Sequence, residues 1–392
     1  MTNVKHHLAA ALLSVAIAPG LTASGRALAQ RPAQPATRPA AQWVVPAGFQ
    51  VSTFADNIEN PRDMAIGPRG TVFVGSQRAG KVYAVVDNNG DHRADRVVVI
   101  ASGLSQPNGV AMRNGALYVA TTSRLLRYDD IERHLDAPPA PVVVRDSLPN
   151  PTAGHTWKFN AFGPDDLLYM SLRAPCNAWI SPPMVSTIVR MKPDGSNLEV
   201  FAEGVRNSVG FDWHPTTHEL WFTDNGRDAL GDDVPGDELN VAWKAGLHFG
   251  FPFCHQGDVK DPEFGAQRAC STTELPAKVL GAHVAAIGMR FYTGTMFPAE
   301  YRNAVLVAEH GSWNRSKPSG YRVMVLRTDG RRVTSYDTFL DGFMPNRESA
   351  PGGWAAQGVA SGRPADVLQM PDGSILVSDD TGNRLLRVSY RR

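Results

Sequence analysis

The stretch DMAIGPRGTVFVGSQRAGKVYAV, residues 63–85, decides the fold because its pattern returns along the chain. It holds an apolar segment, a Gly-Pro-x-Gly turn, a second apolar strand, a polar tight turn and a third strand. A late copy, DVLQMPDGSILVSDDTGNRLLRVSY at residues 366–390, keeps this order with a Pro-Asp-Gly turn. Short strands bounded by Gly, Pro and Asn turns are typical of an all-β chain.

Six copies of this pattern can be aligned. Their matching positions, 46, 50, 51, 78 and 78 residues apart, are Met64, Val110, Asn160, Phe211, Met289 and Val367. The four strands of one propeller blade need ~40 to 50 residues. One small sheet cannot bury both of its apolar faces, but six sheets around an axis can. We therefore predict an all-β, six-bladed β-propeller rather than a β-sandwich, closed by a strand over residues 49–54 that pairs with the last blade.

The longer spacings leave room for loops outside the repeat. We expect insertions over residues 228–237 and 253–282, and long loops on a rigid scaffold often carry function. Cys254 and Cys270 could close a local loop and leave Cys176 unpaired, although the sequence does not fix this pairing.

The N-terminus is typical of an exported protein. Lys5 precedes an apolar run over residues 8–18, and Ala27-Leu28-Ala29 has the small-x-small pattern of a signal-peptidase site. We predict a signal peptide (1–29), a Pro- and Ala-rich linker (30–45) and a single propeller domain (46–392). The mature protein should be periplasmic or secreted after cleavage near Ala29. It should have no stable membrane anchor, because no apolar run approaches the ~18 residues that a span needs.

Composition and motifs narrow the function. Lysine and arginine number 39, and aspartate and glutamate 38, so we expect no nucleic-acid partner. No HExxH, GxSxG, P-loop or GxGxxG motif is present, which argues against the common hydrolase and nicotinamide-dependent classes. A CxxCH haem motif is also missing, so a redox activity would need a separate electron acceptor.

Three polar clusters lie at strand ends of the repeats. His155 stands in a turn before the third copy, and a histidine can exchange a proton near neutral pH. Arg206 and Asn207 precede the fourth copy, where they could bind a ligand or brace the loop. An acidic run over residues 224–240 offers oxygen donors, the ligands that Ca²⁺ prefers, although acidic turns are often only solvated.

Several long motifs resemble the soluble glucose and sorbosone dehydrogenases, most closely the sorbosone dehydrogenase-like branch. They include EGVRNSVGFDWHP at residues 203–215, HGSWNRSKPSGY at 310–321 and GRPADVLQMPDGS at 362–374. The likeness runs from about residue 46 to residue 390. It implies oxidation of an aldose sugar, or of a related aldehyde or hemiacetal, with hydride transfer to bound pyrroloquinoline quinone (PQQ).

The resemblance also implies roles for single residues. His155 matches the general base, and Arg206 and Asn207 match the pair that polarises the quinone carbonyl. The expected cofactor-binding residues are Arg206, Asn207, His310, Trp313, Arg315 and Arg363. The expected residues around Ca²⁺ are Asn225, Gly226, Arg227, Asp237 and Glu238. The sequence departs from the family at Arg227, where a proline is usual, and at Ala365, where a second arginine is usual.

Two other classes of function remain open. A Ca²⁺-dependent lactonase or esterase propeller would need a central cage of Glu, Asn and Asp side chains, one from each of several blades. A non-catalytic propeller that binds a sugar or a protein could use Trp157, Trp313 and Trp354 as stacking surfaces.

Overall fold

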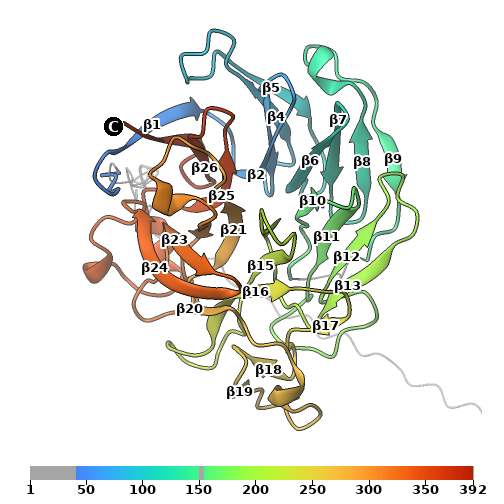
Figure 1. The fold of residues 1–392 in the computed structure, drawn as a ribbon, viewed down its shortest axis with the longest axis vertical. Coiled ribbons are helices and arrows are strands. Elements are labelled where there is room, and N and C mark those ends of the chain that lie inside the picture. The colour runs from blue at the N-terminus through green and yellow to red at the C-terminus, as the bar shows by residue number, and fades with distance from the viewer. Residues whose placement is uncertain (1–40, 150–153, 392) are drawn as a thin grey trace, which may run out of the picture. The chain divides into compact units, whose positions relative to one another are not determined.

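The computed structural model describes residues 41–149 and 154–391. The predicted signal peptide and most of the predicted linker lie outside the described residues. Six sheets of four or five strands surround a common axis (Figure 1). The predicted six-bladed β-propeller is therefore confirmed.

Each sheet forms one blade, and in blades 1 to 5 the strands follow chain order outward from the axis. Blade 1 contains β2 (Pro61–Ile66), β3 (Val72–Ser76), β4 (Val82–Val86) and β5 (Arg96–Ala101). Blade 2 contains β6 (Gly109–Arg113), β7 (Ala116–Ala120), β8 (Leu125–Tyr128) and β9 (Val142–Arg145). Blade 3 contains β10 (Asn160–Phe162), β11 (Leu168–Leu172), β12 (Thr187–Met191) and β13 (Glu199–Glu203). Blade 4 contains β14 (Phe211–Trp213), β15 (Leu220–Asp224), β16 (Gly236–Ala242) and β20 (Lys278–Ala282). Blade 5 contains β21 (Ala286–Phe291), β22 (Val305–Glu309), β23 (Arg322–Asp329) and β24 (Arg332–Leu340). Blade 6 contains β25 (Pro364–Gln369), β26 (Ile375–Asp379) and β27 (Arg384–Tyr390).

The ring closes through β1 (Phe49–Asp56), which pairs antiparallel with β27 as the outer strand of blade 6. This confirms the predicted closing strand, which extends two residues beyond the predicted end. Phe49 packs edge to face against Phe297, Phe339 and Tyr390. Closure therefore buries an aromatic cluster and leaves blade 6 with a full set of four strands.

Apolar side chains between neighbouring blades form the core. Met289 of β21 and Val307 of β22, for example, belong to one buried cluster with Trp221 of β15 in the blade before. Gly288 shows how closely the inner strands approach, because a Cβ there would lie 2.5 Å from the Cα of Asp366 in β25. Only glycine fits at such a contact.

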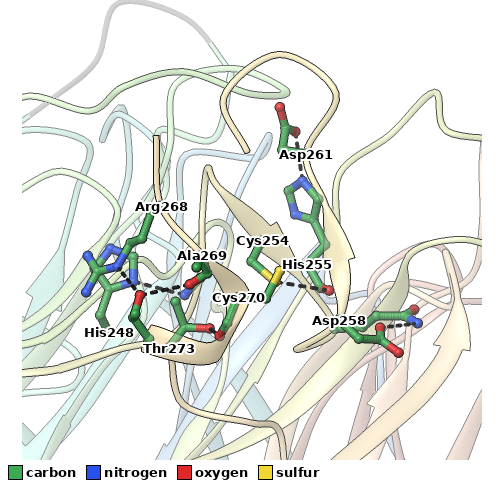
Figure 2. The surroundings of a disulfide bond; sticks show 12 residues. His248, Cys254, His255, Asp258, Asp261, Arg268, Ala269, Cys270 and Thr273 are labelled. Carbon is green, nitrogen blue, oxygen red and sulfur yellow. Dashed lines mark hydrogen bonds and ion pairs between the residues drawn. A yellow bond between two sulfur atoms is a disulfide. The ribbon is translucent and has the colours of Figure 1, made fainter. Parts of the chain in front are cut away.

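The longest connection lies between β16 and β20. It contains β17 (Leu247–His248), which pairs in parallel with β13 as a fifth strand of blade 3, and the hairpin of β18 (Cys254–His255) and β19 (Val259–Lys260). A disulfide joins Cys254 and Cys270, and Cys176 is a free, exposed thiol. Figure 2 shows this disulfide below His255, which points toward Asp261. The expected insertion over 253–282 was therefore set too long, because its last five residues form β20.

Helices are short. They are η1 (Ile131–Arg133), η2 (Cys270–Thr272), η3 (Ala299–Tyr301), η4 (Arg347–Ser349) and α1 (Ala355–Val359). None of the helices within residues 41–149 and 154–391 has the length and apolar character needed to cross a bilayer.

Candidate functional site

Polar loops of blades 3, 4 and 5 meet in one pocket. The loops that enter β10, β14 and β21 and those that leave β15 and β22 contribute to it, because the start of an inner strand lies at the same blade edge as the end of its antiparallel neighbour. Its lining consists mainly of ionisable and amide side chains: His155, Arg206, Asn207, Asn225, Gly226, Asp228, Asp237, His283, Ala285, Trp313 and Asn314. The pocket thus brings together seven residues that the sequence proposed for a site.

His155 is held in one orientation. Its Nδ1 lies 3.0 Å from the carbonyl oxygen of Ala174, so Nδ1 carries the proton and donates it to that carbonyl. Burial and the positive charges of Arg206 and Arg173 lower the pKa of His155 well below its usual value. The imidazole is therefore neutral at physiological pH, and its Nε2 has a lone pair that can accept a proton.

Arg206 and Asn207 are fixed by their backbone as well as their side chains. Both backbone N–H groups donate to the buried carboxylate of Asp224 at the end of β15. Arg206 Nη2 donates to Asp228 Oδ2 at 2.8 Å and to Asn177 Oδ1 at 3.0 Å. Its Nε donates to the Asn177 carbonyl and its Nη1 to the Asn225 carbonyl. A guanidinium has five N–H groups, so one on Nη1 is left for another acceptor.

Asn207 also keeps one side-chain N–H group available for a ligand. Its Oδ1 accepts a hydrogen bond from Arg173 at 2.8 Å, which fixes which end of the amide is oxygen. Its Nδ2 donates to Asn225 Oδ1 at 3.1 Å and keeps a second N–H. Arg173 in turn stacks 4.1 Å above the Trp157 ring. Next to a neutral histidine, the pocket therefore holds two spare N–H donors for an oxygen that gains negative charge.

The expected metal ligands separate into two groups. Asn225, Gly226 and Asp237 line the pocket, whereas Arg227 and Glu238 do not. Arg227 pairs with Asp261 beside the disulfide hairpin. Glu238 accepts hydrogen bonds from the Gln256 N–H at 2.6 Å and from Asn240 at 2.8 Å.

The carboxylates of this region are deeply buried. Burial raises the pKa of Asp237 to about 7 and that of Glu238 to about 8. Asp237 accepts the backbone N–H groups of Gly226 and Ala286. Within residues 41–149 and 154–391, no three His, Cys, Asp or Glu side chains are arranged to hold a metal. Any Ca²⁺ here would depend on backbone and amide oxygens in addition to Asp237 and Asp228.

Only Trp313 among the four additional cofactor candidates lines the pocket. His310 Nε2 lies 3.0 Å from Asp380, away from the lining. Arg315 is bonded to the acidic loop at Asp233. Arg363 donates to the carbonyls of His310 and Gly311 and to Gln357. In this arrangement His310, Arg315 and Arg363 hold loops together rather than reaching the pocket.

Sequence reasoning gave no role to several residues that shape the pocket. Asp228 bridges Arg206 and Asn314, whose Nδ2 donates to Asp228 Oδ1 at 2.6 Å. Asn314 Oδ1 is buried and finds no hydrogen-bond partner among the described residues. Arg173 donates a hydrogen bond to Asn207, and Asn177 accepts two from Arg206, so these contacts fix the orientation of both catalytic candidates. Asp228 belongs to the acidic run that offered oxygen donors and Asn314 to the motif at residues 310–321, whereas no sequence signal indicated Arg173 or Asn177.

The fold and this pocket define the class of protein: a six-bladed β-propeller with an ionisable site built from the loops at one edge of its blades. Residues 186–381 match the family model described as TrAA12-like. A protein of Borreliella burgdorferi, itself uncharacterised, is 33% identical over an alignment of 371 positions that covers 89% of this chain and 91% of that protein. This chain belongs to the TrAA12-like family.

Solved structures share the fold. The PQQ domain of pyranose dehydrogenase from Coprinopsis cinerea is 18% identical, with a TM-score of 0.75 and coverage of 90% of this chain and 98% of that chain. The calcium structure of the Trichoderma reesei AA12 enzyme is 19% identical, with a TM-score of 0.73 and coverage of 91% and 98%. The PQQ-bound aldose sugar dehydrogenase from Streptomyces coelicolor is 20% identical, with a TM-score of 0.62 and coverage of 89% and 100%. The resemblance to the soluble sugar dehydrogenases noted from the motifs is thereby confirmed.

The pocket fits the reactive end of PQQ. The spare N–H groups of Arg206 and Asn207 suit a quinone carbonyl, and the indole of Trp313 offers a flat wall. The carboxylates of PQQ have fewer partners. Arg206 is the one guanidinium in the lining, and it already pairs with Asp228.

Proposed function

We propose that this protein is a PQQ-dependent sugar dehydrogenase that oxidises an aldose or a related aldehyde or hemiacetal. One observation carries the proposal: a neutral His155 with an available Nε2 shares a pocket with two fixed N–H donors, on Arg206 and Asn207. The PQQ-binding sugar dehydrogenases that share this fold support it.

When bound, PQQ supplies the two-electron acceptor for a hydride from the substrate carbon. His155 Nε2 takes the proton of the substrate hydroxyl, while Nδ1 stays bonded to the Ala174 carbonyl and keeps the ring in place. Arg206 and Asn207 stabilise negative charge on an oxygen bound between them. They need no reorganisation, because Asp224 and Arg173 already hold them.

We assign the metal role to Ca²⁺ near Asn225, Gly226 and Asp237, with Asp228 as a further carboxylate at the same wall. Arg227 and Glu238 would support this turn from behind, through Asp261 and Gln256. Electrons would leave to a separate acceptor, and the leader would place the protein in the periplasm or outside the cell.

The test is reconstitution. The purified chain is mixed with PQQ and Ca²⁺, and dye reduction is followed against a panel of aldoses, sorbosone and simple alcohols. We expect reduction that requires PQQ and a sugar, and that falls when a chelator removes Ca²⁺. No absorbance change with PQQ and no turnover with any sugar would reject the proposal.

A further inference from the structure

Two tryptophans form an exposed stack next to the pocket. The rings of Trp313 and Trp354 have centroids 4.7 Å apart and planes inclined by 31°. Trp313 is 37% exposed and Trp354 is 68% exposed, yet Trp313 also lines the pocket that contains His155. The aromatic surface therefore continues directly from the candidate site onto the outside of the protein.

The loop that carries Trp313 is anchored on both sides. Asn314, the next residue, donates to Asp228 inside the pocket. Arg315 binds the carboxylate of Asp233, and the Ser316 N–H donates to the carboxylate of Asp232. The indole is thus presented by a loop fixed to blade 4, although it leaves from blade 5.

The segment that carries Trp354 is tied to the same loop. The Gly353 N–H donates to the Arg315 carbonyl at 2.7 Å. A Cβ at Gly352 would lie 2.2 Å from the Ser316 carbonyl oxygen, so the two backbones touch there. Ala356 of α1 is buried in the core, which leaves Trp354 at the start of this helix facing outward.

Arg363 locks the two loops together. Its guanidinium is buried and donates to the His310 carbonyl at 2.9 Å and the Gly311 carbonyl at 2.7 Å, at the base of the Trp313 loop. It also donates at 2.7 Å to the Gln357 side chain in the Trp354 helix. A preformed surface of this kind loses little conformational entropy when a ligand binds.

We propose that Trp313 and Trp354 form a stacking subsite for an uncharged pyranose ring, so that the protein binds an oligosaccharide with its terminal sugar in the pocket. A pyranose has an apolar C–H face and polar hydroxyl edges, which suits an indole surface beside a polar pocket. Arg315 pairs with the Asp233 carboxylate and Arg363 is buried beneath the loops, so neither side chain is placed to meet an anionic ligand at the tryptophan surface. The second part of this inference, the terminal sugar in the pocket, rests on the proposed function.

The test measures binding without PQQ, so that it does not depend on turnover. Intrinsic fluorescence and calorimetry follow titration with glucose, cellohexaose, xylohexaose and maltohexaose. We expect at least one hexasaccharide to bind about tenfold more tightly than the monosaccharide. Trp354→Ala should lower that affinity about tenfold, and Trp354→Phe should restore part of it.

Trp243→Ala is the matched control, because Trp243 is 39% exposed but lies outside the pocket lining. It should leave oligosaccharide affinity unchanged. The subsite is rejected if no hexasaccharide binds more tightly than glucose, or if Trp354→Ala and Trp243→Ala behave alike. Dye reduction by free glucose with no oligosaccharide binding would reject this subsite and keep the proposed function. Binding that depends on Trp354 with no turnover would do the reverse.

Discussion

His155 and His310 both follow or precede a strand of the repeat, and both lie near an arginine, but their ring nitrogens are used differently. His155 gives Nδ1 to a backbone carbonyl and keeps Nε2 available in the pocket. His310 places Nε2 3.0 Å from Asp380 and 3.4 Å from Arg62, in a closed cluster that joins blades 5, 6 and 1. Burial lowers the pKa of His310 to about 3. The comparison teaches that the partner of each nitrogen, rather than the motif around the histidine, separates a candidate base from a structural residue.

The largest contrast should come from removing each histidine. His155→Ala should lower kcat about 10²- to 10⁴-fold, because proton transfer loses its acceptor. His310→Ala should keep kcat within about tenfold and lower stability instead. Steady-state dye reduction and thermal unfolding of both variants would measure this. A His310→Ala protein with normal stability and no PQQ binding would move His310 into the cofactor site.

The two arginines extend the comparison. Arg206→Ala should lower kcat about 10²- to 10³-fold, because a fixed donor to the developing charge is lost. Arg62 pairs with Asp380 where both side chains are buried, so Arg62→Ala should cost about 3 to 5 kcal/mol of unfolding free energy. Urea unfolding and kcat/KM separate the two effects. Equal stability losses with equal rate losses would erase the distinction between the two clusters.

The disulfide hairpin supports the pocket of His155 and Arg206 rather than the buried cluster of His310, Arg62 and Asp380. Asp261 holds Arg227, and Gln256 holds Glu238 and the Gly236 N–H, so the hairpin braces the acidic turn of the pocket. Replacing Cys254 and Cys270 by serine should lower the unfolding free energy by about 3 kcal/mol. Calcium dependence of the rate should weaken a few-fold. Denaturation measures the loss of stability, and Ca²⁺ titration of the rate measures the effect on the acidic turn. An unchanged Ca²⁺ titration would contradict the bracing role of the hairpin.

The smallest effect concerns pH. His310 has a pKa of about 3 in the folded protein, against about 6.5 when unfolded, so the unfolded state binds more protons between these values. Stability therefore rises with pH across this window and falls as the solution is acidified. The free energy of unfolding should fall between pH 6.5 and pH 4.5, and in His310→Gln this fall should be smaller by about 2 kcal/mol. Urea unfolding at both pH values checks this, and an unchanged slope would mean that other groups cause the acid sensitivity.

Much of the fold could be read from the sequence, because each blade repeats a local pattern of strands and turns. The closing strand was predictable because a ring of six blades must close, and the strand over residues 49–54 precedes the first copy and can pair with the last blade. The pocket residues His155, Arg206 and Asn207 were found from motifs at strand ends. The separation of Asp237 from Glu238 could also have been expected, since neighbouring residues on β16 face opposite sides of the sheet.

Other features depend on contacts that no local pattern contains. The bridge from Arg206 through Asp228 to Asn314 joins three loops, and Asn314 is 86 residues from Asp228. Arg363 matches a cofactor-binding position in sequence, but its partners are the carbonyls and side chain that join the two tryptophan loops. Such pairings are set by loop conformation, which repeats and motifs do not determine.

The most direct test of the central claim is the pH profile of kcat/KM for the enzyme loaded with PQQ and Ca²⁺. Burial, Arg206 and Arg173 lower the pKa of His155, so the base stays unprotonated to well below its usual titration range. We expect the acid limb of the profile to lie below pH 6.5, the value for a free histidine, and to disappear from the residual rate of His155→Ala. A limb at or above pH 6.5, or the same limb in the variant, would contradict His155 as the base.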